Sequence, residues 1–118
     1  MAVKTAAPDL KPQWFQILLA LADRDLHGYA IMKEVLDRTD GRMRLWPATL
    51  YGSLKRMLES GLIVEVDVPA RSSDDQIDRR FYRITRLGKR RLAEEVERMT
   101  EYIAAARAKH VSHQGKPA

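Results

Sequence analysis

The chain has 118 residues, a length that accommodates one domain around a single hydrophobic core. Hydrophobic residues make up 45% of it, which excludes a disordered polymer, and 31% charged residues predict a well-solvated surface. The formal net charge of +5 calls for an anionic partner, which at this stage could be nucleic acid, acidic lipid or acidic protein.

The cysteine and hydropathy patterns indicate an intracellular protein. The chain contains no cysteine, which excludes disulfides, thiolate metal sites and cysteine nucleophiles and fits a reducing compartment. Its longest apolar stretch, residues 14–22, is interrupted by Gln16 and is too short to span a bilayer. We therefore expect a cytoplasmic protein with no membrane partner.

Two helices are predicted in the first part of the chain. Residues 1–11 show no periodicity, so we expect a loose arm there. Pro12 suits a first helical turn, and the residues that follow at helical spacing form a buried stripe: Trp14, Ile17, Leu18 and Leu21. A polar turn over 23–28 precedes a short helix over about 29–39, whose inward positions are Ile31, Met32, Val35 and Leu36.

A third helix and a β-hairpin are predicted next. Pro47 opens the helix and Gly61 ends it. Its inward face consists of apolar residues: Leu50, Leu54, Met57 and Leu58. Its outward positions are polar or small: Gly52, Lys55, Arg56 and Glu59. Residues 63–68 and 80–84 are β-branched or aromatic runs on either side of a polar loop, which predicts two strands paired as a hairpin.

Thr85 suits the N-cap of a last helix that runs to about His110, with a frayed tail over 111–118. The predicted fold class is therefore mainly α with a small β-hairpin. We expect a winged helix-turn-helix domain over 12–85 and a C-terminal dimerisation helix over 86–110. In such domains the third helix enters the major groove of DNA and the wing touches the neighbouring backbone.

Positive charge is concentrated in one part of the sequence. Between Arg79 and Leu92 there are seven basic residues and no acidic one, and Lys55 and Arg56 lie on the outward side of the third helix. Such a cluster neutralises phosphates and releases their counterions. A merely solvated helix face is the alternative, but beside a hairpin and a polar helix face we favour double-stranded DNA as the partner.

Over roughly residues 13–92 the sequence resembles the PadR-like family of bacterial transcriptional regulators. The resemblance is carried by three stretches in order: His27-Gly28-Tyr29-Ala30-Ile31, then Pro47-Ala48-Thr49-Leu50-Tyr51-Gly52-Ser53-Leu54-Lys55-Arg56 with Gly61-Leu62-Ile63, and Arg80-Phe81-Tyr82-Arg83-Ile84-Thr85 leading to Gly88. It implies winged-helix homodimers that bind operator DNA, usually as repressors. Ala48 and Phe81 depart from the glycine and tyrosine that are common in the family, and the single C-terminal helix is typical of its short members.

The resemblance also implies which residues contact DNA, since side chains of these types reach phosphates or base edges. The candidate DNA-binding residues are Thr49, Tyr51, Ser53, Lys55, Arg56, Arg79 and Arg80. For Tyr51 the alternative is a structural tyrosine wedged between the second and third helices. His27 and Gly28 are better explained as a turn and helix-start signal, and Tyr29 as a core residue.

The last helix carries a heptad seam. Its apolar positions are Leu92, Val96, Met99, Ile103 and Ala106. Packing of this helix onto the first one is the alternative, but we favour a homodimer, because two-fold dimers read successive major grooves. Candidates for a crevice that binds an aromatic or hydrophobic effector at this interface are Trp14, Met99, Tyr102 and Ile103, with plain core packing as the alternative.

An enzyme and a protein-interaction module are the rival function classes. The histidines His27, His110 and His113 form no metal spacing with a carboxylate pair, and neither a phosphate-cradling glycine loop nor a nucleophile elbow is present. We therefore expect no catalysis, no metal and no cofactor. A winged domain without specific DNA binding is the second alternative, because a fold does not determine a function. The preferred prediction is a homodimeric, sequence-specific DNA-binding repressor.

Overall fold

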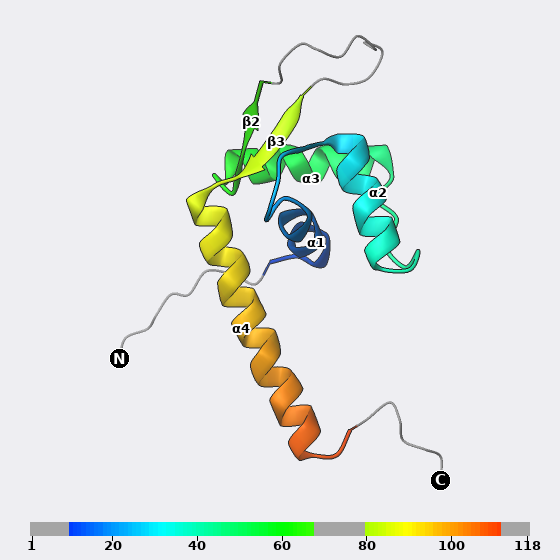
Figure 1. Cartoon of the computed structure of the whole chain (residues 1–118), viewed down its shortest axis with the longest axis vertical. Helices are drawn as coiled ribbons and strands as arrows, with labels where there is room; N and C mark the ends of the chain where they lie inside the picture. The colour runs from blue at the N-terminus through cyan, green and yellow to red at the C-terminus, as the bar shows by residue number, and fades with distance from the viewer. Residues whose placement is uncertain (1–9, 68–79, 112–118) are drawn as a thin grey trace.

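The computed structural model describes residues 10–67 and 80–111. Three helices and a small sheet form the body of the molecule, and the last helix projects away from it (Figure 1). The elements in chain order are α1 (Pro12–Ala20), β1 (Leu26–His27), α2 (Gly28–Arg38), α3 (Pro47–Glu59), β2 (Ile63–Val66), β3 (Phe81–Ile84) and α4 (Arg86–Ala108). The predicted fold class is confirmed.

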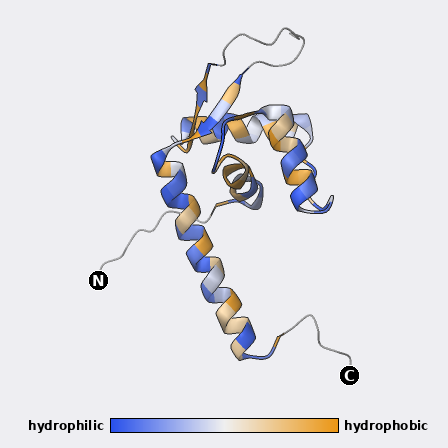
Figure 2. Cartoon of the chain, in the orientation of Figure 1, coloured by the Kyte–Doolittle hydropathy of each residue, from blue (hydrophilic) through white to orange (hydrophobic). Residues whose placement is uncertain are grey.

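The core lies where the apolar stripes of the helices meet, around the strongly hydrophobic helix α1 (Figure 2). The residues of these stripes that are buried are Ile17, Leu18, Leu21, Ile31, Val35, Leu50, Leu54 and Met57. The expected stripes are therefore largely confirmed, with Trp14, Met32 and Leu58 packed at their edges. The expected loose arm includes residues 10 and 11, but Leu10 is buried in this same core, so the predicted arm is too long at its C-terminal end. Residues 1–9 lie outside the described part.

The sheet has three antiparallel strands rather than the expected two. The strand order is β1-β3-β2, with Ile63 opposite Ile84 in one pair and Leu26 opposite Tyr82 in the other. The segment that forms β1 falls within the expected polar turn. A two-residue strand is too short to show an alternating pattern, so only its pairing with β3 reveals it.

The start of α2 confirms the structural role expected for His27 and corrects that of Tyr29. The Nδ1 atom of His27 accepts a hydrogen bond from the backbone N–H of Ala30 at 3.2 Å, which caps the helix. The side chain of Tyr29 is 59% exposed and is not a core residue. The core side of α2 is made by Gly28, Ile31 and Val35, and Tyr29 lies about 100° around the helix from Gly28.

The junction between β3 and α4 is held by Thr85, which caps α4 as expected. Its Oγ1 accepts a hydrogen bond from the N–H of Gly88 at 3.0 Å and donates toward the carbonyls of Gly61 at 2.7 Å and Leu62 at 3.0 Å. The Thr85 N–H donates to the Leu62 carbonyl at 3.0 Å. These hydrogen bonds tie the first turn of α4 to the segment that leaves α3. A Cβ atom on Gly88 would overlap the Leu62 carbonyl oxygen.

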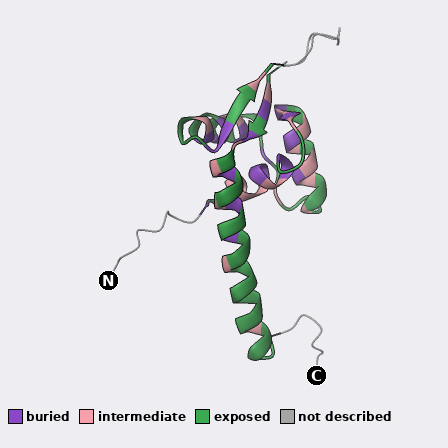
Figure 3. Cartoon of the chain, turned by 60° about the vertical axis from the view of Figure 1, so that its left-hand side comes forward, coloured by how far each residue is buried: buried purple, intermediate pink, exposed green. Residues whose placement is uncertain are grey.

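Beyond its first turns, α4 leaves the core. Its buried residues are Gly88, Leu92 and Glu95, and the rest of the helix is mostly exposed (Figure 3). The exposed residues include four large apolar side chains: Val96, Met99, Tyr102 and Ile103. Among the described residues, no helix is long and apolar enough to cross a membrane.

An ion pair joins the sheet to the segment before α2. Continuing the register of β1 and β3 by one residue places Asp25 opposite Arg83, and two hydrogen bonds of 2.9 and 3.1 Å join their side chains. The hydrogen bonds from Arg83 lower the pKa of Asp25 from its ordinary value, although partial burial opposes this. The carboxylate therefore stabilises the folded chain as an ion.

The close approach at Gly88 predicts a large difference between two glycine substitutions. Gly88→Ala pushes a methyl group into the backbone of Leu62, so we expect the free energy of unfolding to fall by about 1–3 kcal/mol in urea denaturation. Gly52→Ala is the matched control: its Cβ meets open space, and we expect a stabilisation of up to about 1 kcal/mol from helix propensity. Equal stability of Gly88→Ala and the parent chain would contradict the close approach.

The ion pair predicts a pH-dependent effect of Asp25→Asn. Because the folded pKa of Asp25 is lowered, its stabilisation is present at neutral pH and is lost as the pH falls through that folded pKa. We expect the variant to melt at a lower temperature than the parent at neutral pH, and the two to converge in strong acid. Asp23→Asn is the control, because Asp23 makes no ion pair within the described residues. A difference that stays constant with pH would refute this assignment.

Candidate nucleic-acid interface

Helix α3 turns one continuous exposed face outward, made of small and polar residues. Pro47 at its first position pre-sets the helical backbone, and the buried residues Leu50, Leu54 and Met57 hold the opposite side on the core. The exposed residues of α3 are Pro47, Ala48, Thr49, Gly52, Lys55, Arg56 and Glu59. Gly52 lies at the centre of this face with Lys55 on one side and Arg56 on the other, as the helical period requires. We call this surface the outer face of α3.

Two candidate residues on α3 lie at the flanks of the outer face rather than on it. The Tyr51 side chain is half-buried, and its hydroxyl packs against the position that a Gly28 Cβ would occupy. It is therefore wedged between α3 and the start of α2, the alternative considered for it. Ser53 is only 6% exposed and lies on the flank that faces α1.

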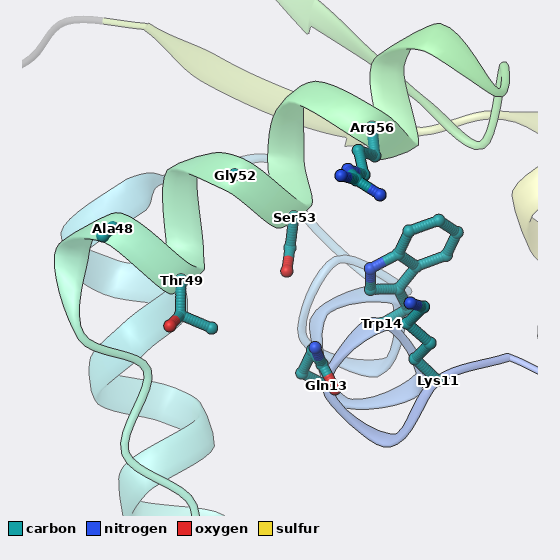
Figure 4. Close-up of a pocket in the computed structure, with 8 residues that line it drawn as sticks. All are labelled: Lys11, Gln13, Trp14, Ala48, Thr49, Gly52, Ser53 and Arg56. Carbon is teal, nitrogen blue, oxygen red and sulfur yellow. The ribbon is translucent and has the colours of Figure 1, made fainter.

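A notch of about 270 Å³ separates the outer face of α3 from the beginning of α1 (Figure 4). Its lining residues from α1 and the residue before it are Lys11, Gln13 and Trp14, and those from α3 are Ala48, Thr49, Gly52, Ser53 and Arg56. The Ser53 hydroxyl and the Arg56 guanidinium both point from α3 toward α1. Three candidate DNA-binding residues, Thr49, Ser53 and Arg56, thus share one concave site.

A second groove, of about 320 Å³, separates α3 from the wing. It brings together Lys55 and Arg80 with Glu65 and Tyr82, although α3 and β3 are distant in sequence. The Arg80 guanidinium lies 3.8 Å from the Glu65 carboxylate, a long and exposed ion pair. Lys55 on α3 and Arg80 on the wing therefore line the same groove. Arg79, the other wing candidate, lies outside the described residues.

The basic side chains of the outer face are not neutralised by neighbours. Within residues 10–67 and 80–111, neither Lys55 nor Arg56 forms an ion pair or a side-chain hydrogen bond. Arg38 on α2, in contrast, pairs with Glu34 at 2.6 Å, and Arg83 is held by Asp25. Arg83, in the predicted basic cluster, is thus engaged within the fold, whereas the two α3 cations remain available to an external anion.

The structure adds residues that the sequence pattern did not single out. Lys11 and Gln13 reach the notch only because α1 packs across α3, a tertiary contact with no local signal. Trp46, the N-cap residue of α3, is 62% exposed, and the Arg44 guanidinium lies 5.0 Å from its ring centre. A tryptophan directly before a helix-starting proline is visible in the sequence and is the one signal that could have pointed to this residue.

The residues of the predicted seam divide between the core and the surface. Leu92 is buried in the core of its own chain, whereas Val96, Met99 and Ile103 are exposed along α4. Val96 and Leu92 line a shallow groove between α4 and Ala22. Trp14, grouped with α4 residues in the predicted effector crevice, instead lines the notch beside α3, and Met99, Tyr102 and Ile103 do not line that notch.

Comparison with known proteins identifies relatives over most of the chain. The model of the transcriptional regulator PadR-like family matches residues 17–94. An uncharacterized protein from Lysinibacillus sphaericus is 36% identical over 88 residues, which cover 72% of this chain and 75% of that protein.

Several solved structures share the fold. A transcriptional regulator from Clostridium thermocellum has a TM-score of 0.66 at 26% identity, covering 84% of this chain and 89% of its own. A PadR family transcription regulator from Clostridium difficile R20291 has a TM-score of 0.62 at 28% identity, covering 84% and 99%. Bacillus subtilis PadR in complex with operator DNA has a TM-score of 0.62 at 19% identity, covering 91% and 51%, a likeness of fold.

The family match begins within α1 and ends within α4, so it includes the whole of α3 and the groove between α3 and the wing, whereas Lys11, Gln13 and Trp14 of the notch precede it. The chain belongs to the PadR-like family of transcriptional regulators.

Proposed function

We propose that this protein is a homodimeric transcriptional repressor that binds a two-fold symmetric DNA operator. The observation that carries the proposal is the outer face of α3, which is exposed, bears two cations without carboxylate partners among the described residues, and lies between two grooves. A helix with these properties fits the major groove of B-DNA. The operator-bound state of Bacillus subtilis PadR, which shares this fold, supports the same use of the fold here.

The outer face of α3 offers small residues at its centre and cations on either side, and these two groups are expected to contact DNA differently. Gly52 and Ala48 have small or no side chains at its centre, so the helix backbone can approach base edges closely. Lys55 and Arg56 on either side reach guanine edges or phosphates. Arg80 extends the contact to the wing, where a cation beside the groove favours the DNA backbone. From the family resemblance we expect that binding of the operator represses transcription.

Dimerisation through α4 is the second part of the proposal. The helix has 23 residues, about 35 Å of length, and presents Val96, Met99 and Ile103 to solvent in a heptad spacing. Such side chains are rarely exposed together on a helix without a partner. A second copy of α4 covers the same residues on both chains, as a two-fold interface requires.

An apolar effector fits the same interface. Tyr102 is 63% exposed next to Ile103, and an aromatic or hydrophobic compound bound against them would lie between two copies of α4. A ligand that changes the angle between these helices changes the spacing of the two α3 helices and therefore the operator affinity.

The proposed DNA interface predicts weaker salt-sensitive binding in Lys55→Ala/Arg56→Ala. The DNA duplex for this test is obtained by selecting the sequences that the parent protein binds from random DNA. Fluorescence anisotropy then measures the affinity of each protein for this duplex at several salt concentrations. We expect weaker binding and a slope of log affinity against log salt reduced by about 0.9 for each phosphate that is no longer neutralised. Arg107→Ala/Lys109→Ala, with the same charge change at the far end of α4, should bind as the parent does. If the parent recovers no duplex with salt-sensitive binding, the chain is a protein-interaction module instead.

The seam predicts a change of oligomeric state in Val96→Asp/Met99→Asp. Two carboxylates on the seam would be buried without partners in a dimer, so we expect a folded monomer in analytical ultracentrifugation. Ala105→Asp/Ala108→Asp places the same groups on the opposite side of α4 and should stay dimeric. A dimer that persists in the seam variant would show that another surface joins the two chains.

A further inference from the structure

The notch between α1 and α3 is lined by donors of hydrogen bonds. Lys11 contributes an ammonium, Gln13 an amide, Arg56 a guanidinium and Ser53 a hydroxyl that points into the notch, and Thr49 also lines it. No Asp or Glu is among the described residues that line it. A concave site with two cations and no carboxylate suits an anionic group with several oxygen atoms.

Ser53 is the strongest indication that the notch has a ligand. Its side chain is more than nine-tenths buried, its hydroxyl points into the notch, and it makes no hydrogen bond within the described part of the chain. The Ser53 hydroxyl keeps contact with solvent at the notch and can donate a hydrogen bond there. An anionic oxygen in the notch would accept this hydrogen bond.

The beginning of α1 keeps the Lys11 charge at the mouth of the notch. Its ammonium lies 5.8 Å from the centre of the Trp14 ring, within the range of a cation–π contact. Trp14 itself packs against the core, so the ring is a fixed platform. The Lys11 carbonyl accepts a hydrogen bond from the Phe15 N–H at 3.0 Å, which joins this residue to the first turn of α1.

We propose that the notch binds one phosphate of the operator backbone and that Lys11 and Gln13 are DNA-contacting residues. This inference rests on the proposed DNA binding and extends the contact surface from α3 to α1. Thr49 and Arg56 belong both to the outer face of α3 and to the notch. With α3 in the major groove, the sugar–phosphate backbone of the adjacent DNA strand would therefore pass the notch. Ser53 and Gln13 then donate to phosphate oxygens, while Lys11 and Arg56 neutralise its charge. The phosphate positions α3 without any base being read.

The test compares Lys11→Ala and Ser53→Ala with the parent on the duplex obtained by selection. For Lys11→Ala we expect a salt slope reduced by about 0.9 and the same order of preference among base substitutions in the operator. Ser53→Ala should weaken binding without changing the slope, because it removes no charge. Lys33→Ala is the control: its ammonium pairs with Asp37 at 3.6 Å on α2, and its slope should match the parent's.

Neutral methylphosphonates placed one at a time in the duplex locate the phosphate. We expect one position per half-site at which the parent binds more weakly and Lys11→Ala shows no further weakening. Parental slope and affinity in Lys11→Ala, or additive effects at every position, would overturn the notch proposal while leaving DNA binding by α3 intact. If the parent itself shows no salt-sensitive DNA binding, the proposed function fails instead. Unchanged thermal melting of both variants shows that weaker binding does not come from unfolding.

Discussion

The packing of α4 against the segment that leaves α3 is the constraint on which the rest of the structure depends. One hydroxyl, that of Thr85, connects the carbonyls of Gly61 and Leu62 to the amide of Gly88. Because Gly88 has no side chain, α4 starts directly against the backbone of Leu62. These backbone contacts, together with the packing of α4 against α1, fix the direction in which α4 leaves the body. In a dimer joined by α4, this geometry would hold two α3 helices at a fixed spacing, as half-sites about 34 Å apart demand.

Ion pairs neutralise some of the cations of this chain and leave others without a carboxylate partner. Cations around α2 and on β3 are matched by carboxylates: Glu34 binds both Arg24 and Arg38, and Asp25 binds Arg83. Lys55 and Arg56 on the outer face of α3, and Lys11 at the notch, have no such partners in the described residues. Several acidic residues are thus engaged by cations elsewhere in the fold, whereas Lys55 and Arg56 stay unpaired, within the described part of the chain, on the exposed face that they share with Glu59. Unpaired cations can neutralise DNA phosphates, which releases the counterions condensed on the DNA.

Much of the fold could be predicted from the sequence, because its helices follow local rules. Pro47 and Gly61 mark the ends of α3, Thr85 caps α4, and apolar spacing identifies the core faces. The outward position of Lys55 follows from the helical period alone. Prediction was wrong where long-range contacts decide. Strand β1 exists only through its pairing with β3, and Tyr29 is exposed despite lying beside a buried glycine.

The sequence by itself determined the order of the four helices and the hairpin, the family and the outer face of α3, since caps, periodicity and motifs are local properties of the chain. Only the tertiary structure decided which side chains share a site. The crossing of α1 over α3 places Lys11, Ser53 and Arg56 around one notch, and the wedge of Tyr51 against Gly28 takes that tyrosine off the outer face. Periodicity specifies the direction of a side chain from its own helix. The neighbour that it meets depends on how the helices pack, which no local pattern encodes.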